Sequence, residues 1–248
     1  KADIVGPEGE DWRVPVSELE ARLSLLSDLL AKAGFGGAII QHPVDLYYYA
    51  GGRQNGSLFV PATATSATCE SGGDGPTFFV RRSLSRAIFE AGGDDAPLKL
   101  CKFPSMNEFA QHLKDMGAEG SIGLQQGEIP ASLHKYFNEK LSLFGDCPDV
   151  TSIIHGQREV KSAWEIEMLE AGADIQLKMF DAVTEVGGEG ITELELVAAA
   201  EAVSRAEGYG GSVQMRRFPM QCDRGVIIAG RAGGIPSFFD SALGGVGA

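Results

Sequence analysis

The feature that most constrains the fold of this chain is an alternation of short apolar runs with longer amphipathic stretches over residues 17–154. Short apolar runs bounded by turn-forming residues are typical of buried strands. They predict strands at 37–40, 57–60, 77–80, 98–103, 121–124 and 150–154. Amphipathic stretches predict helices between them, at about 83–91, 107–116 and 131–141, after a first helix that ends at Gly34. This order predicts an α/β fold with a largely parallel or mixed sheet.

The character of the sequence changes near Gly156. Two long helices are predicted at 163–185 and 193–207, separated by a glycine-rich segment at 187–190, and a strand pair is predicted at 212–220 and 225–229. Helix, helix, strand, strand is a different order from the alternation that precedes it. We therefore expect two domains, 1–156 and 157–248.

Four of the predicted helix starts share one pattern, a Ser or Thr followed three residues later by Glu. In a capping box the hydroxyl accepts from the N3 amide and the carboxylate accepts from the amide of the cap residue. The pattern predicts capping boxes at Ser17/Glu20, Ser105/Glu108, Ser162/Glu165 and Thr192/Glu195.

Composition excludes several classes of function. The formal net charge is -13 and the pI is about 4.7, so long-range repulsion disfavours nucleic acid as a partner. No apolar run approaches the roughly 18 residues that would predict a membrane span. The four cysteines are scattered, which favours free thiols in a reducing compartment, and we expect a cytoplasmic protein.

No complete catalytic set can be read from the residues alone. The glycine-rich stretch 34–37 follows a helix and precedes a strand, the reverse of a dinucleotide-binding turn. No P-loop, nucleophile elbow or zinc-binding helix motif occurs. The four histidines lack ligand spacing and are expected in loops or at the surface. They are His42, His112, His134 and His155.

Four short motifs, in order along the chain, resemble a known family. Asp45-Leu46-Tyr47-Tyr48-Tyr49-Ala50-Gly51 is similar to the Asn-x-x-Tyr-Leu-(Thr/Ser)-Gly motif of creatinase-type N-terminal domains. The stretch 158–169 resembles Arg-x-x-Lys-Ser-x-x-Glu-Ile-x-x-(Leu/Met), which opens the pita-bread domain of creatinase, aminopeptidase P and prolidase. Residues 190–196 and 230–236 are similar to later segments of that domain. The resemblance implies a ribonuclease-H-like α/β domain followed by an incomplete α+β pita-bread domain.

The family resemblance implies a metal-dependent peptidase. Its members typically hold two divalent ions, Mn, Co or Zn, and cleave the Xaa-Pro bond of small peptides with a metal-activated water. Their ligands are two Asp, one His and two Glu, on strands that follow the region where this sequence ends. Asp223 and Asp240 are spaced too widely for the family pattern and receive no metal role. We expect the chain to be a fragment with no metal site, inactive alone, from a protein that forms a homodimer.

Three residues are candidates for substrate binding through the same resemblance. Arg217 and Phe218 lie on the strand expected to edge the pocket, although a solvated strand face explains them equally well. Ser237 follows the family's proline, where aminopeptidase P and prolidase usually have a His. This departure and the missing metal ligands favour one alternative, a non-catalytic homologue that acts as a protein-interaction module, although truncation explains the missing ligands equally well. A creatinase-like amidinohydrolase is a further alternative.

Overall fold

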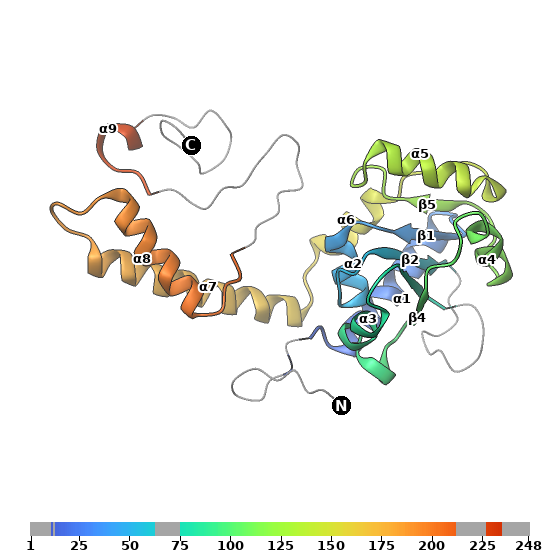
Figure 1. Cartoon of the computed structure of the whole chain (residues 1–248), viewed down its shortest axis with the longest axis horizontal. Coiled ribbons are helices and arrows are strands. Elements are labelled where there is room, and N and C mark those ends of the chain that lie inside the picture. The colour runs from blue at the N-terminus through green and yellow to red at the C-terminus, as the bar shows by residue number, and fades with distance from the viewer. Residues whose placement is uncertain (1–10, 12, 63–74, 212–226, 235–248) are drawn as a thin grey trace. The chain divides into compact units, whose positions relative to one another are not determined.

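The computed structural model describes residues 11, 13–62, 75–211 and 227–234. The chain divides into two compact units, Lys1–Val160 and Lys161–Ala248. Figure 1 shows the elements of both units in chain order. Each unit is described by itself below.

The first unit is built on one mixed sheet of five strands in the order β4-β3-β2-β1-β5. The strands are β1 (Gly37–Ile40), β2 (Gly56–Pro61), β3 (Thr77–Val80), β4 (Lys99–Lys102) and β5 (Ile122–Leu124). β1 pairs with β5 and β3 with β4 in parallel, whereas β2 is antiparallel to both of its neighbours. The predicted α/β class with a mixed sheet is confirmed, and so are these five strands.

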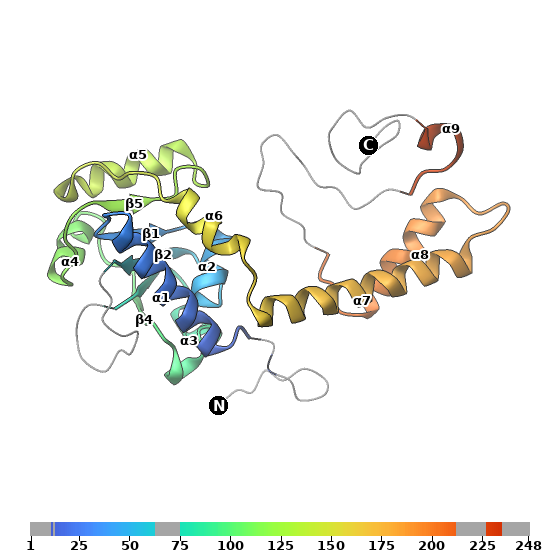
Figure 2. The same ribbon diagram turned by 180° about the vertical axis from the view of Figure 1, so that it is seen from behind.

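Helices cover both faces of this sheet, as Figures 1 and 2 show from opposite sides. Successive residues of a strand point to opposite faces, so each strand supplies both cores. In β1, Ala38 and Ile40 belong to one core and Ile39 to the other. The first core is closed by α1 (Val16–Lys32), α2 (Pro43–Ala50), α3 (Leu84–Glu90) and α6 (Thr151–Glu159), and the second by α4 (Phe109–Asp115) and α5 (Ala131–Lys140).

The predicted strand at 150–154 is wrong, because this segment begins α6. Asp149 forms only an isolated parallel bridge with Leu124, and its carboxylate then accepts the amide of Thr151 at 2.9 Å. That bond satisfies a free amide in the first turn of the helix. Val150 and Ile154, four residues apart, pack together into the first core. A short apolar run fits a strand and a buried helical turn equally well, which is why the pattern was ambiguous.

Helix α2 was not predicted. It begins at Pro43, which suits the first helical position, and ends at Gly51, whose φ of 70° lies in the left-handed region. Five of its eight residues are buried, so it lacks the polar face by which an amphipathic helix is recognised.

The second unit has two long helices that pack against each other, α7 (Ala163–Val186) and α8 (Glu193–Ala206), and a short helix α9 (Gly230–Gly233). No residue of α7 is fully buried. The strand predicted at 212–220 and the start of the one at 225–229 lie outside the described residues, and 227–229 form no strand. No helix in the described part of either unit is long and apolar enough to cross a membrane.

Two of the four predicted capping boxes are confirmed, Ser162/Glu165 at α7 and Thr192/Glu195 at α8. The other two are wrong because the helices begin elsewhere. Pro15 precedes the first residue of α1, so Ser17 lies inside the helix. Helix α4 begins only at Phe109, after a turn in which the Glu108 amide donates to the Ser105 carbonyl at 3.0 Å.

Candidate functional site

The first unit contains a polar cluster in which two of the motif segments meet. Asp45, in the first turn of α2, is completely buried, and its Oδ1 accepts from the guanidinium of Arg158 near the end of α6 at 2.6 Å. Its Oδ2 accepts from Nε2 of Gln125 at 2.7 Å and lies 3.2 Å from Nδ1 of His42. Position in the first turn also suits a carboxylate, since free amides and the helix dipole favour negative charge there.

A second carboxylate, that of Glu128, extends the cluster. It is 8% exposed and lies between two imidazoles, 2.9 Å from Nε2 of His155 and 3.7 Å from Nε2 of His42. His42 therefore has Asp45 on one ring nitrogen and Glu128 on the other. We call Asp45, His42, Gln125, Glu128, His155 and Arg158 the Asp45 cluster.

Gln125 joins this cluster to the sheet. Its Oε1 accepts from the backbone amides of Gln41, at 2.7 Å, and His42, at 3.1 Å, just beyond the end of β1. Because its Nε2 donates to Asp45, one buried side chain satisfies two backbone donors and one carboxylate oxygen. Gln125 thereby ties the end of β1 and the start of α2 to the segment after β5.

The tyrosines of the same motif fix α2 to its neighbours. The ring of Tyr48 packs against two guanidinium groups, that of Arg22 at 4.0 Å and that of Arg158 at 5.5 Å from the ring centre. The hydroxyl of Tyr49 donates to Gln157 of α6 at 2.8 Å, and Gln157 donates to the Arg22 carbonyl at 2.9 Å. Burial raises the pKa of Tyr49 well above its ordinary value, so the phenol remains a neutral donor.

The chemistry of these groups indicates a structural role. Both oxygens of Asp45 are engaged by donors from three segments, and a carboxylate so bonded is a poor base or nucleophile. What the arrangement does is hold α1, α2, α6 and the segment after β5 together. Asp45 and Arg158 both belong to the family-like motifs, but no pattern in the sequence predicts their contact with each other.

The described residues do not fit a metal ion. No group of three or more His, Cys, Asp or Glu side chains in ranges 13–62, 75–211 and 227–234 is arranged to hold one. The guanidinium of Arg158 at Asp45 also makes the Asp45 cluster unfavourable for a cation. We assign no metal ligand here.

The three substrate-binding candidates, Arg217, Phe218 and Ser237, lie outside the described residues, as do Asp223 and Asp240. Their roles therefore stay predictions. Of the four histidines, His42 and His155 bond the carboxylates of the Asp45 cluster, His112 packs edge-on against Phe79, and His134 lies in α5.

Comparison with known proteins places this architecture in a family. Residues 22–160, more than half of the chain, match the Creatinase/Prolidase N-terminal domain. The chain therefore belongs to the creatinase/prolidase family. The match contains every residue of the Asp45 cluster.

Individual relatives agree with this assignment. The chain is 24% identical over 190 residues to a Xaa-Pro dipeptidase of Pyrococcus furiosus, which covers 77% of this chain and 49% of the relative. Among solved structures, Xaa-Pro dipeptidase from Bacillus anthracis superimposes with a TM-score of 0.63 at 18% identity, covering 77% of this chain and 50% of the other. Prolidase from Pyrococcus furiosus superimposes with a TM-score of 0.59 at 24% sequence identity, covering 76% of this chain and 54% of the other.

The chain thus spans about half the length of the relatives it matches. The structural likenesses are to prolidases and dipeptidases, and they confirm the fold class predicted from the motifs. The relatives are peptidases by name.

Proposed function

We propose that the protein to which these residues belong is a metal-dependent peptidase that hydrolyses the Xaa-Pro bond of small peptides. The observation that carries the proposal is the match to a Xaa-Pro dipeptidase over 190 residues. This match is longer than the N-terminal family domain at 22–160, so it includes residues outside that domain. The motifs of the second unit also begin their two long helices as expected, with capping boxes at Ser162 and Thr192.

The proposal assigns two divalent ions, Mn, Co or Zn, to the active protein and none to the described residues, which do not fit a metal ion. We further propose that residues 157–248 correspond to the first half of a pita-bread catalytic domain, that the protein forms a homodimer, and that it works in the cytoplasm. The 248-residue chain alone is expected to be inactive.

The test is an assay of the whole protein, expressed from its gene. We expect proline release from Xaa-Pro dipeptides with Mn, Co or Zn supplied, and little release from matched Xaa-Ala dipeptides. Longer Xaa-Pro peptides would separate an aminopeptidase from a dipeptidase. No turnover of any Xaa-Pro substrate with any of the three metals would refute the proposal. Light scattering would refute the dimer if it showed a monomer at every concentration.

Ser237 favours a second candidate, because the family's usual histidine is replaced at that position. The protein would then be a homologue without prolyl specificity, either a creatinase-like amidinohydrolase or a non-catalytic interaction module. Creatine belongs in the same assay for this reason. Turnover of creatine but not of Xaa-Pro peptides would select the amidinohydrolase.

A further inference from the structure

The arginines of the first unit divide into two groups by their partners. Four of the seven are ion-paired or hydrogen-bonded to a carboxylate: Arg13 to Asp11, Arg22 to Glu18, Arg86 to Glu90 and Arg158 to Asp45. The other three, Arg53, Arg81 and Arg82, have no carboxylate partner within the described part of the chain. In a protein with 34 acidic residues and 21 basic ones, three unpaired arginines together are unexpected.

The sheet brings these three arginines to one place. In the antiparallel pair β2–β3, Gly56 lies opposite Val80, and the Arg81 amide donates to the Asn55 carbonyl at 2.8 Å. Arg53 lies three residues before Gly56, and Arg82 lies two residues after Val80. In the parallel pair β3–β4, Val80 lies opposite Lys102, so a fourth cation joins them. We call Arg53, Arg81, Arg82 and Lys102 the basic sheet end; all four are exposed.

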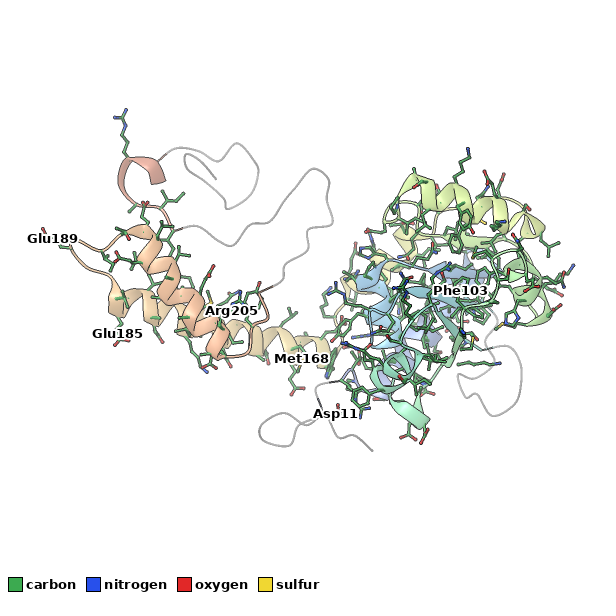
Figure 3. The ribbon with its side chains drawn as sticks, viewed as in Figure 1. Asp11, Phe103, Met168, Glu185, Glu189 and Arg205 are labelled. Carbon is green, nitrogen blue, oxygen red and sulfur yellow. The ribbon has the colours of Figure 1, made fainter. Side chains whose placement is uncertain are left out.

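Part of this surface is held in position. The guanidinium of Arg81 lies 4.0 Å from the ring centre of Phe103, which is labelled in Figure 3. Ser83, directly after Arg82, has a φ of 58° and is the one non-glycine residue of the described ranges with a left-handed backbone. Such a conformation costs about 1–2 kcal/mol, and strained residues occur often at functional sites.

None of these four cations forms an ion pair with a carboxylate of the described residues. Glu90 bonds Gln54, the residue after Arg53, at 3.0 Å, and its carboxylate also accepts from Arg86 at 2.8 Å. Three guanidinium groups and one ammonium group therefore present their donors to solvent. Guanidinium groups match carboxylates in two-point geometry, so an anion that bears several carboxylates is the complementary ligand.

We propose that the basic sheet end binds an acidic segment of a partner protein, through carboxylates that pair with Arg53, Arg81 and Arg82. Because the net charge of the protein is -13, we expect the ligand to be short. A long polyanion such as nucleic acid would extend over the acidic remainder of the surface and be repelled. A short peptide interacts mainly with charges within a Debye length, about 8 Å at physiological salt. Such binding is independent of whether the protein is a peptidase.

The experiment measures binding of fluorescein-labelled octaglutamate to the 248-residue chain by fluorescence anisotropy at low and physiological salt. The wild-type chain should bind, more weakly as salt rises. Arg81→Glu/Arg82→Glu should weaken binding at least tenfold. The matched control is Lys114→Glu/Lys135→Glu, which changes net charge equally at exposed lysines of α4 and α5 and should weaken it less than threefold.

A second variant, Arg53→Gln/Lys102→Gln, leaves the Arg81–Phe103 stacking in place and should also weaken binding if circular dichroism shows a native fold. Three results would overturn the proposal: no binding of octaglutamate at low salt, an equal loss in the lysine control, or tighter binding of a labelled octathymidylate. The last result would identify a phosphate ligand instead of an acidic protein segment.

Discussion

Replacing Arg158 by Met tests whether the Asp45 cluster stabilises the first unit. The substitution keeps the aliphatic part of the side chain but removes the guanidinium donor at 2.6 Å from a carboxylate that is completely buried. Asp45 keeps Gln125 and His42 as neighbours, yet it loses the positive charge that compensates its own. We therefore expect a large loss of stability for a single ion pair.

The size of this loss depends on how deeply the ion pair between Arg158 and Asp45 is buried. Removing one partner of a fully buried ion pair costs about 3–5 kcal/mol, whereas an exposed pair contributes about 0–1 kcal/mol. The Arg158 side chain is 25% exposed, so the expected loss lies between these limits, at about 2 kcal/mol. For a unit of this size that corresponds to a fall in Tm of roughly 4–8 °C.

Arg86→Met is the matched control. It also deletes one guanidinium and leaves one carboxylate, that of Glu90, but the Arg86 side chain is 70% exposed. Its cost should stay below about 0.5 kcal/mol. Urea unfolding of the 248-residue chain, followed by circular dichroism, measures both variants. The reasoning is refuted if Arg158→Met costs no more than Arg86→Met.

Three further changes test other parts of the structure by the same unfolding measurement. Gly51→Ala should cost at least about 2 kcal/mol, because the residue has a φ of 70° and a Cβ would lie 2.4 Å from the Glu90 carbonyl oxygen; an unchanged midpoint would contradict this. Thr192→Ala should cost about 1 kcal/mol through loss of its capping box, seen as reduced helicity of α8. Burial raises the pKa of Asp149, but hydrogen bonds from Thr151 and from the amides after β5 outweigh it, so the pKa is lowered. Its stabilising contribution is therefore complete above its ordinary pKa and is lost as pH falls through the folded value, so the difference from Asp149→Asn should be largest at neutral pH and shrink in acid.

The sheet of the first unit could be predicted because its strands are short, apolar and bounded by turn residues. Segments where the pattern failed are those whose structure depends on distant contacts. Residues 151–154 are helical because Asp149 satisfies an amide of the first turn and Ile154 reaches the core under α1. Helix α2 has no recognisable period because its buried residues face both the core and the Asp45 cluster.

The candidate site was harder to predict than the fold. Asp45 and Arg158 are 113 residues apart, and no spacing rule relates residues at that distance. Gln125 and Glu128 belong to no motif, and neither residue type is unusual in a loop. Their importance depends on burial, which becomes visible only once α2, α6 and the segment after β5 are packed together.

The motifs that carry the family resemblance therefore have a structural meaning in the first unit. Asp45, Tyr48 and Tyr49 hold α2 against α1 and α6, and Arg158 closes the same network two residues before the unit ends. We expect a homologue that had lost its activity to keep the same contacts, because they stabilise the first unit and take no part in catalysis. Their presence consequently supports the family and the fold, whereas the choice between an active peptidase and a non-catalytic homologue depends on residues elsewhere. The assay of Xaa-Pro peptides and the binding measurement at the basic sheet end address separate properties. The Asp45 cluster stabilises the fold on which both of them depend, so its presence predicts neither result.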